Sequence, residues 1–198
     1  MKVQAFVLSA AAFCLLADAP PSKLKLGDAV PVFALSGIDG KSHKSNDLKG
    51  PTVVVFLSTQ CPYVIASEGR INDLAKAYKG KVTFVGINGN DVEGYPKESL
   101  EAMKAHAKQQ GYVFPYLKDE SQDATRAFGA IATPDFFVFD KGKLVYRGRM
   151  DDNTSPKKNA PITQRDLKDA LDALLVGKSI SSDQKPSRGC SIKWKKTA

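Results

Sequence analysis

The residue in this sequence best suited to covalent chemistry is Cys61, within Ser58-Thr59-Gln60-Cys61-Pro62-Tyr63-Val64. The apolar, β-branched run Thr52–Leu57 precedes it, and Pro62 is a residue type that the first position of a helix tolerates. A cysteine at the first turn of a helix lies near unpaired backbone N–H groups, which favour the nucleophilic thiolate. The pattern therefore predicts a reactive thiol near solvent. The alternative is that Cys61 is a small buried apolar residue.

A second candidate feature is the pair Thr133-Pro134, which stands just before the predicted strand Phe136–Asp140. A proline at a strand entry is tolerated with a trans peptide bond, and that is the purely structural interpretation. A cis bond would instead leave a backbone edge open beside the thiol, able to pair with an extended substrate chain. The second interpretation predicts a substrate-binding edge at Thr133 and Pro134.

The residue counts limit other kinds of chemistry. The three cysteines and two histidines form no C-x-x-C or H-x-x-x-H spacing, so we expect neither a metal site nor a cofactor. The formal net charge of +8 would suit nucleic-acid binding. However, most basic residues alternate with acidic ones, and the one dense cluster, Lys193, Lys195 and Lys196, lies in a short tail. No nucleic-acid partner is expected.

Residues 1–19 have the features of a signal peptide, with Lys2 followed by the apolar stretch Val3–Ala17. The stretch is too short for a bilayer crossing, which needs about 20 apolar residues. We therefore expect export, to the periplasm or out of the cell, with cleavage after Ala17 or Ala19. The alternative is an uncleaved anchor, the one expected link to a membrane. Cleavage would remove Cys14 and leave two cysteines in an oxidising compartment.

Alternating strand and helix patterns over residues 20–178 indicate one domain that positions these candidates. Expected strands are Val30–Leu35, Thr52–Leu57, Lys81–Asn88, Phe114–Leu117, Phe136–Asp140 and Lys143–Arg149. Expected helices begin at Pro62, Pro96, Ser121 and Thr163, where Thr163 and Asp166 suggest a capping box. The turn at Asp39-Gly40 predicts an N-terminal β-hairpin extension. The fold class is α/β, a mixed β-sheet with helices on both faces, followed by a basic C-terminal tail, residues 179–198.

From about Lys23 to Gly177 the chain resembles the thioredoxin-like superfamily. The similar segments are T-V-V-V-F-L-S-T-Q-C-P-Y, Q-D-A-T-R-A-F-G-A-I-A-T-P-D-F-F-V-F-D and K-G-K-L-V-Y-R-G-R. Within the superfamily the chain is similar to the redoxin branch, the alkyl hydroperoxide reductase and thiol-specific antioxidant group. The resemblance implies a thioredoxin-like fold with redox activity at Cys61. It also implies substrate contacts at Thr133, at Pro134 in the place of the cis-proline, and at Pro62 and Tyr63.

Around Cys61 the chain departs from the patterns of its relatives. Thioredoxins carry a second cysteine where this chain has Val64, and a buried acid where it has Val55. Peroxiredoxins carry the pattern P-x-x-x-T/S-x-x-C. In this chain Ser58 stands at the hydroxyl position, which makes it a catalytic candidate, and Val54 stands where the pattern has proline. The usual resolving thiol is therefore missing from the helix.

The preferred function is an exported thiol oxidoreductase that exchanges disulfides through Cys61, with a disulfide-containing protein or peptide as substrate and an unidentified thiol reductant. One alternative is a thiol peroxidase that reduces hydroperoxides. Another is a non-catalytic redoxin-fold binding module. Cys190 is the candidate resolving thiol if Ile192 and Trp194 dock the tail beside the site; otherwise it is a structural or intermolecular cysteine.

Overall fold

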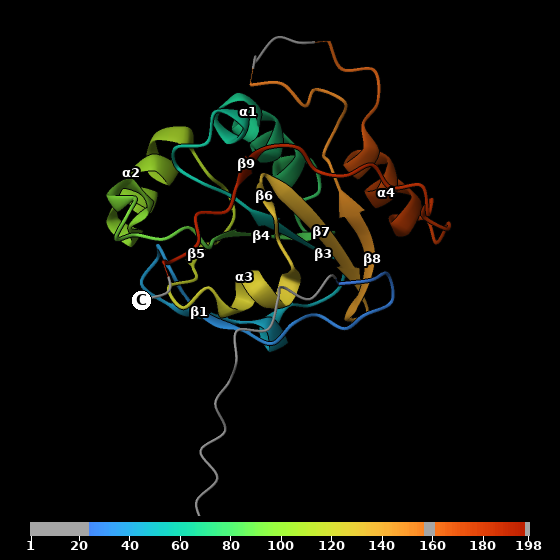
Figure 1. Ribbon diagram of the computed structural model, residues 1–198. Coiled ribbons are helices and arrows are strands. Elements are labelled where there is room, and N and C mark those ends of the chain that lie inside the picture. The colour runs from blue at the N-terminus through green and yellow to red at the C-terminus, as the bar shows by residue number, and fades with distance from the viewer. Residues whose placement is uncertain (1–23, 157–160, 197–198) are drawn as a thin grey trace, which may run out of the picture.

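The centre of the fold is a seven-stranded mixed sheet with the order β2-β1-β5-β4-β3-β7-β8 (Figure 1). The computed structural model describes residues 24–156 and 161–196, so the predicted signal peptide and Cys14 lie outside the described residues. The strands are β1 (Ala34–Gly37), β2 (Ser42–Lys44), β3 (Thr52–Phe56), β4 (Thr83–Asn88), β5 (Tyr116–Lys118), β7 (Asp135–Asp140) and β8 (Lys143–Gly148). Two short strands, β6 (Ala132–Thr133) and β9 (Cys190–Ser191), form a separate antiparallel pair.

The chain connections determine which helices cover which face of the sheet. Helix α1 (Pro62–Ala77) connects β3 to its parallel neighbour β4, and helix α2 (Leu100–Gln110) connects β4 to its parallel neighbour β5. Both connections lead toward the same edge of the sheet. Right-handed crossovers therefore place both helices on one face. Helix α3 (Asp123–Phe128) precedes the return to β7 and packs on the opposite face, whereas α4 (Asp166–Leu175) shares the face of α1. The mixed sheet covered on both faces confirms the expected fold class.

Alternation along β3 divides the core into two layers. Val53 and Val55 pack with the residues of α1, α2 and α4, whereas Val54 and Phe56 pack with α3 and the N-terminal segment. Every residue of β3 is buried, as the continuous apolar run indicates for a central strand. The loop that follows β3 therefore starts from a fully buried central strand and carries Cys61 into α1.

The N-terminal strand begins later than expected. The predicted strand Val30–Leu35 was wrong in its bounds. Val32 is 83% exposed, and the β-pairing of the described chain before β1 is limited to an isolated bridge between Ala29 and Lys143. The expected hairpin is present, with β1 paired antiparallel to β2 and followed by a short 3₁₀ turn (Ser45–Asp47).

Three helix starts also differ from the sequence prediction. Helix α3 begins at Asp123, with Gln122 rather than Ser121 as its N-cap. Pro96 opens the 3₁₀ turn η2 (Pro96–Glu98) rather than α2, and the hydroxyl of Ser99 caps α2 by accepting from the Ala102 N–H at 3.3 Å. The capping box expected at Thr163 is absent because its backbone N–H donates to Asp152 instead, at 3.0 Å, and α4 begins at Asp166.

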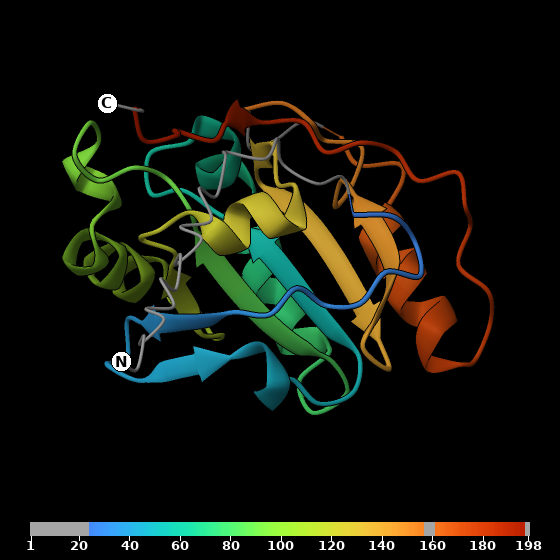
Figure 2. The same cartoon turned by 60° about the horizontal axis from the view of Figure 1, so that its bottom comes forward.

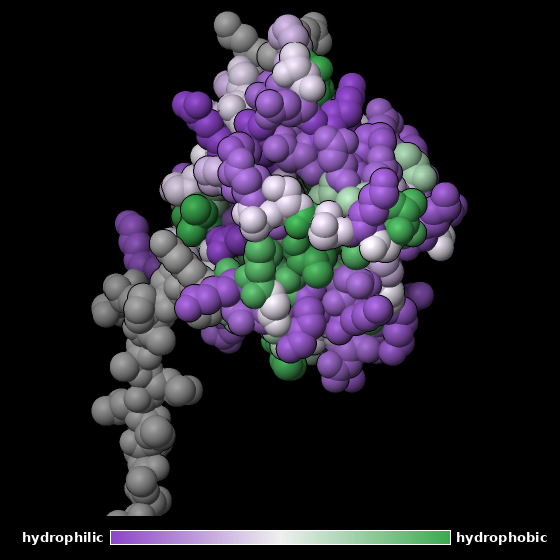
Figure 3. Space-filling model, turned by 90° about the vertical axis from the view of Figure 1, so that its right-hand side faces the viewer, coloured by the Kyte–Doolittle hydropathy of each residue, from purple (hydrophilic) through white to green (hydrophobic). Residues whose placement is uncertain are grey.

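The C-terminal tail runs from α4 back across the molecule to the side that carries α2, passing over β6 (Figure 2). The face bearing β8 and α4 is mostly hydrophilic with a small hydrophobic area near its middle (Figure 3). Among the residues that the structure describes, no helix is long and apolar enough to cross a membrane.

Candidate active site

Cys61 is the N-cap residue of α1, with Pro62 at the first helical position. Its Sγ donates a hydrogen bond to the carbonyl oxygen of Thr133 at 3.0 Å, and the residue is only 2% exposed. The expectation of a thiol near solvent was therefore wrong. The position of Cys61 at the start of α1 is as predicted. However, Thr133 of β6 contacts the sulfur, and β9 pairs with β6 beside it.

Ser58 belongs to the loop between β3 and α1 that carries Cys61. Its hydroxyl oxygen accepts hydrogen bonds from the backbone N–H groups of Gln60 at 3.2 Å and Cys61 at 3.1 Å. The hydroxyl in turn donates a hydrogen bond to the Glu98 carboxylate at 2.6 Å. The hydroxyl thus fixes the backbone on the N-terminal side of the cysteine. In this structure the contacts of Ser58 are to the loop backbone and to Glu98.

Glu98, at the end of the 3₁₀ turn η2, is the site residue that sequence reasoning missed. The carboxylate is buried and accepts from the Ser58 hydroxyl, from the Thr59 N–H at 3.1 Å and from Asn88 Nδ2 at 2.6 Å. All three partners are donors, which suits an ionised carboxylate. A local pattern could not reveal this residue, because its partners stand about ten and forty positions away in the chain.

The Thr133-Pro134 peptide bond is cis. Thr133 is 1% exposed, and its hydroxyl oxygen has no hydrogen-bond partner within the described parts of the chain. The backbone edge here is not open, contrary to the expectation from the sequence. Strand β9 pairs antiparallel with β6, with Cys190 opposite Thr133 and Ser191 opposite Ala132.

This pairing brings Cys190 close enough to Cys61 for the two thiols to affect one another's surroundings. Burial, followed by the hydrogen bond and charge of Cys61, raises the pKa of the Cys190 thiol to about 11, against the opposing effects of Lys193 and the Tyr63 backbone N–H. Both cysteines are free thiols, with Cys190 half-buried.

The remaining predicted residues lie around these two sulfurs. Pro62 is exposed at the start of α1, and the next residue, Tyr63, directs its backbone N–H to Cys190. The side chains of Tyr63 and Pro134 line a surface hollow together with Arg188 of the tail. In residues 24–156 and 161–196, no group of three or more His, Cys, Asp or Glu side chains is arranged to hold a metal ion.

This arrangement can carry out two-electron thiol chemistry. It has a cysteine at a helix N-terminus, a second thiol beside it on the paired strand β9, and a buried carboxylate that supports the loop.

Comparison with known proteins gives the same class of chemistry. The family model of the AhpC/TSA family matches residues 26–147. The thiol-disulfide oxidoreductase ResA of Bacillus thuringiensis is 28% identical over 130 residues, which cover 64% of this chain and 71% of ResA.

Solved structures extend the match to almost the whole chain. An uncharacterised conserved protein from Geobacillus kaustophilus is 44% identical with a TM-score of 0.84, covering 91% of this chain and 97% of its own. A hypothetical protein from Sinorhizobium meliloti is 38% identical with a TM-score of 0.83, covering 89% of this chain and 98% of its own. The chain therefore belongs to the AhpC/TSA family, and it is a thiol-dependent oxidoreductase of the thioredoxin-like fold.

Proposed function

We propose that the protein is an exported thiol-disulfide oxidoreductase whose redox couple is Cys61 and Cys190. The observation that carries the proposal is the pairing of β6 with β9, which sets Cys190 opposite Thr133, the residue whose carbonyl accepts from the Cys61 S–H. Val64 stands at the position in α1 where thioredoxins carry a second cysteine. In the proposed couple, Cys190 of the C-terminal tail supplies the second thiol instead. The presence of this second thiol favours turnover over a binding-only role.

The reaction proceeds by two exchanges. The Cys61 thiolate attacks one sulfur of a substrate disulfide, the substrate S–S bond breaks, and one substrate thiolate leaves and takes a proton from water. Cys190 then loses its proton and attacks Cys61 Sγ, which forms the Cys61–Cys190 disulfide and releases the second substrate thiol. Two electrons pass to the substrate, and an external dithiol restores the protein by the reverse exchange.

The surrounding residues hold this chemistry in place. Ser58 fixes the backbone of Cys61, and the Thr133 carbonyl orients its S–H. Oxidation of Cys61 removes the hydrogen bond and charge that raise the pKa of Cys190, whereas Lys193 and the Tyr63 N–H continue to lower it. Cys190 therefore becomes a better nucleophile once Cys61 has reacted. Pro134, Pro62 and Tyr63 are the expected substrate contacts.

The test is oxidation of the purified chain with a small excess of a model disulfide, followed by peptide mass mapping. We expect a Cys61–Cys190 linkage in the wild-type protein, accumulation of a mixed disulfide at Cys61 in Cys190→Ser, and no turnover in Cys61→Ser. Two free thiols after oxidation, or full turnover without Cys61, would contradict the proposal.

A second candidate function is hydroperoxide reduction, favoured by the occupied edge of β6, since a hydroperoxide needs no strand pairing. Cys61 would attack a peroxide oxygen, which gives a sulfenic acid and an alcohol or water. Cys190 would then attack the sulfenic sulfur, form the same disulfide and release water. Hydroperoxide consumption compared with disulfide turnover at equal enzyme concentration decides between the two functions.

The export part of the proposal is supported by residues 1–19, with their apolar stretch behind Lys2. Expression of the full chain in a bacterial host, fractionation and measurement of the N-terminal sequence test it. We expect the protein outside the cytoplasm with its N-terminus after Ala17 or Ala19. A full-length chain in the cytoplasmic fraction would refute export without affecting the thiol chemistry.

A further inference from the structure

The segment Lys185–Lys195, here called the tail strand, lies along the edge of β6 at which an extended substrate chain was expected to pair. It includes β9, which pairs with β6 so that Cys190 stands opposite Thr133. The Thr133 carbonyl is also the group that binds the Cys61 S–H. A substrate polypeptide that places a cysteine against Cys61 by pairing with this edge would need the register position that Cys190 fills.

Gly189 makes the close approach of the tail strand possible. A Cβ atom built at Gly189 would lie 2.0 Å from the carbonyl oxygen of Thr133 and 2.6 Å from its carbonyl carbon. Both atoms are backbone, so a side chain here cannot be accommodated by a rotamer change. The fit between the tail strand and β6 therefore depends on a glycine one residue before Cys190.

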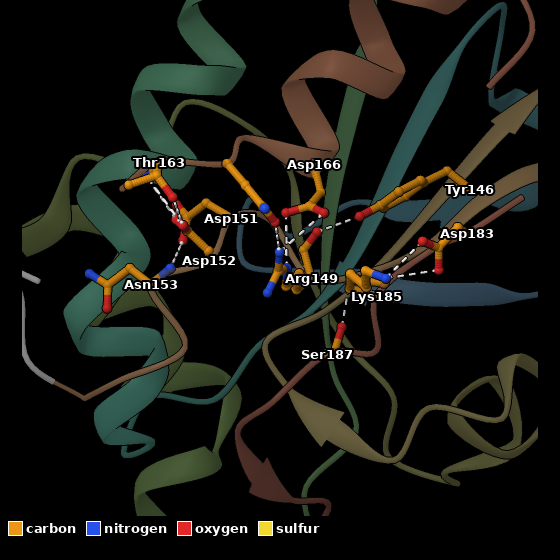
Figure 4. A network of polar contacts seen from close by, with 12 residues as sticks. Tyr146, Arg149, Asp151, Asp152, Asn153, Thr163, Asp166, Asp183, Lys185 and Ser187 are labelled. Atoms are coloured by element: carbon orange, nitrogen blue, oxygen red, sulfur yellow. Dashed lines mark hydrogen bonds and ion pairs between the residues drawn. The ribbon is translucent and has the colours of Figure 1, made fainter. Parts of the chain in front are cut away.

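Before Gly189, the tail strand is held against the end of β8 by hydrogen bonds (Figure 4). The Arg149 N–H donates to the Lys185 carbonyl at 3.0 Å, and the Ser187 hydroxyl donates to the Gly148 carbonyl at 2.7 Å. Arg149 is fixed in turn by an ion pair with Asp166 at 2.9 Å. The start of the tail strand is thus tied to the end of β8 and to α4.

The part of the tail strand beyond Cys190 is also held by hydrogen bonds. The Lys193 N–H donates to Asn90 Oδ1 at 2.8 Å, and the Lys193 carbonyl accepts from the Asp91 N–H at 2.8 Å. Gln122 accepts from the Lys195 N–H at 2.9 Å. Ile192 is buried, and the Arg126 guanidinium lies 4.7 Å from the ring centre of Trp194. These contacts make the tail strand a docked element on both sides of the active site.

We infer that the tail strand determines the substrate class: while docked, it excludes polypeptide disulfides from the edge of β6 and restricts Cys61 to low-molecular-weight disulfides. The inference rests on the proposed function. A small disulfide needs only a local separation of Cys190 from Cys61, because it does not pair with a strand. An extended chain must first displace the whole segment between its two anchors, so it reacts only with the fraction of molecules whose tail is released.

The test compares two oxidants in the Cys190→Ser background, where the reaction stops at the mixed disulfide. One oxidant is hydroxyethyl disulfide and the other is a disulfide-linked, unstructured peptide of about ten residues, long enough to pair as a strand. Gly189→Ala displaces the tail strand, and Gly69→Ala, at an open position of α1, is the matched control. Trp194 is the sole tryptophan of the chain, so its fluorescence reports whether the tail strand is docked.

We expect the peptide to react more slowly than the small disulfide in the background protein. Gly189→Ala should raise the peptide rate by at least about tenfold, because the open fraction increases, and change the small-disulfide rate far less. Gly69→Ala should change neither rate.

Three outcomes would count against these ideas in different ways. An unchanged peptide rate together with an altered Trp194 fluorescence would overturn the inference alone. Unchanged fluorescence in both Gly189→Ala and the larger Gly189→Val would also overturn it, because docking would not depend on the close contact. Absence of a mixed disulfide with either oxidant would instead refute the proposed function.

Discussion

The carboxylate of Glu98 accepts a 2.6 Å hydrogen bond from the Ser58 hydroxyl, and that hydroxyl accepts from the N–H of Cys61. Glu98 is therefore a positioning residue that acts on Cys61 through Ser58. Its second oxygen binds donors from Thr59 and Asn88, so both carboxylate oxygens face hydrogen-bond donors. The arrangement ties a buried acid between β4 and α2 to the loop in front of α1.

We expect Glu98→Gln to lower both the stability and the reactivity of the site. Either orientation of the amide turns its NH₂ toward a buried donor, and a buried unsatisfied group costs about 1–3 kcal/mol. Urea unfolding should show that loss of stability. In the Cys190→Ser background, Glu98→Gln should also change how the rate of Cys61 alkylation depends on pH. Glu101→Gln, exposed in the first turn of α2, is the control. A pH profile identical to that of the control would mean that Glu98 is structural only.

The contact between the two thiols gives a second prediction, on the titration of Cys190. Its pKa of about 11 contains contributions from Cys61, so Cys61→Ala should lower it toward the usual thiol range, while burial still holds it above that range. Thiolate absorbance between pH 7 and 12 measures the change. An unchanged pKa in Cys61→Ala would show that the two thiols do not interact.

The same shift predicts a pH dependence of stability. Because the folded pKa lies above the unfolded value, Cys190 contributes stability that is fully present below about pH 9 and is lost as the pH rises toward 11. The free energy of unfolding of the reduced protein should fall more steeply over this window than that of Cys190→Ser. Parallel profiles for the two proteins would contradict the burial of the thiol.

The sequence predicted the elements whose signals are local. The β-branched run and Pro62 identified the strand, loop and helix around Cys61, because burial on both faces and the first turn of a helix each leave a mark on neighbouring residues. The helix start expected at Pro96 was wrong because Ser99, three residues later, caps α2. The start expected at Thr163 was wrong because its N–H donates to Asp152 rather than to a capping partner. Glu98 and the β6–β9 pairing could not be predicted, since they join residues far apart in the chain.

Arg126 and Trp194 provide a test of tail docking that leaves the cysteines unchanged. Arg126→Ala removes a cation–π contact, and such contacts are worth about 0.5–1 kcal/mol where exposed and more where desolvated. We expect a red shift of Trp194 emission and a corresponding loss of stability, measured by fluorescence and urea unfolding. Lys108→Ala, on the exposed face of α2, is the control. Identical emission in both variants would argue against the docked position of Trp194.

Oxidation should stabilise the protein if Cys61 and Cys190 form a disulfide. The bond would close a long loop that runs from α1 to β9, and in the chain-entropy model such a loop contributes about 4–5 kcal/mol, less any strain. Urea unfolding of the oxidised and reduced wild-type protein measures the gain. The double variant Cys61→Ser/Cys190→Ser, which can neither close the loop nor form a mixed disulfide, should unfold identically in both conditions. The tail strand is already docked in the reduced state, so closing the bond requires little rearrangement of the folded protein. Equal midpoints for oxidised and reduced wild-type protein, with the linkage verified by mass mapping, would mean that the native state absorbs the gain as strain. Equal midpoints without the linkage would count against the redox couple itself.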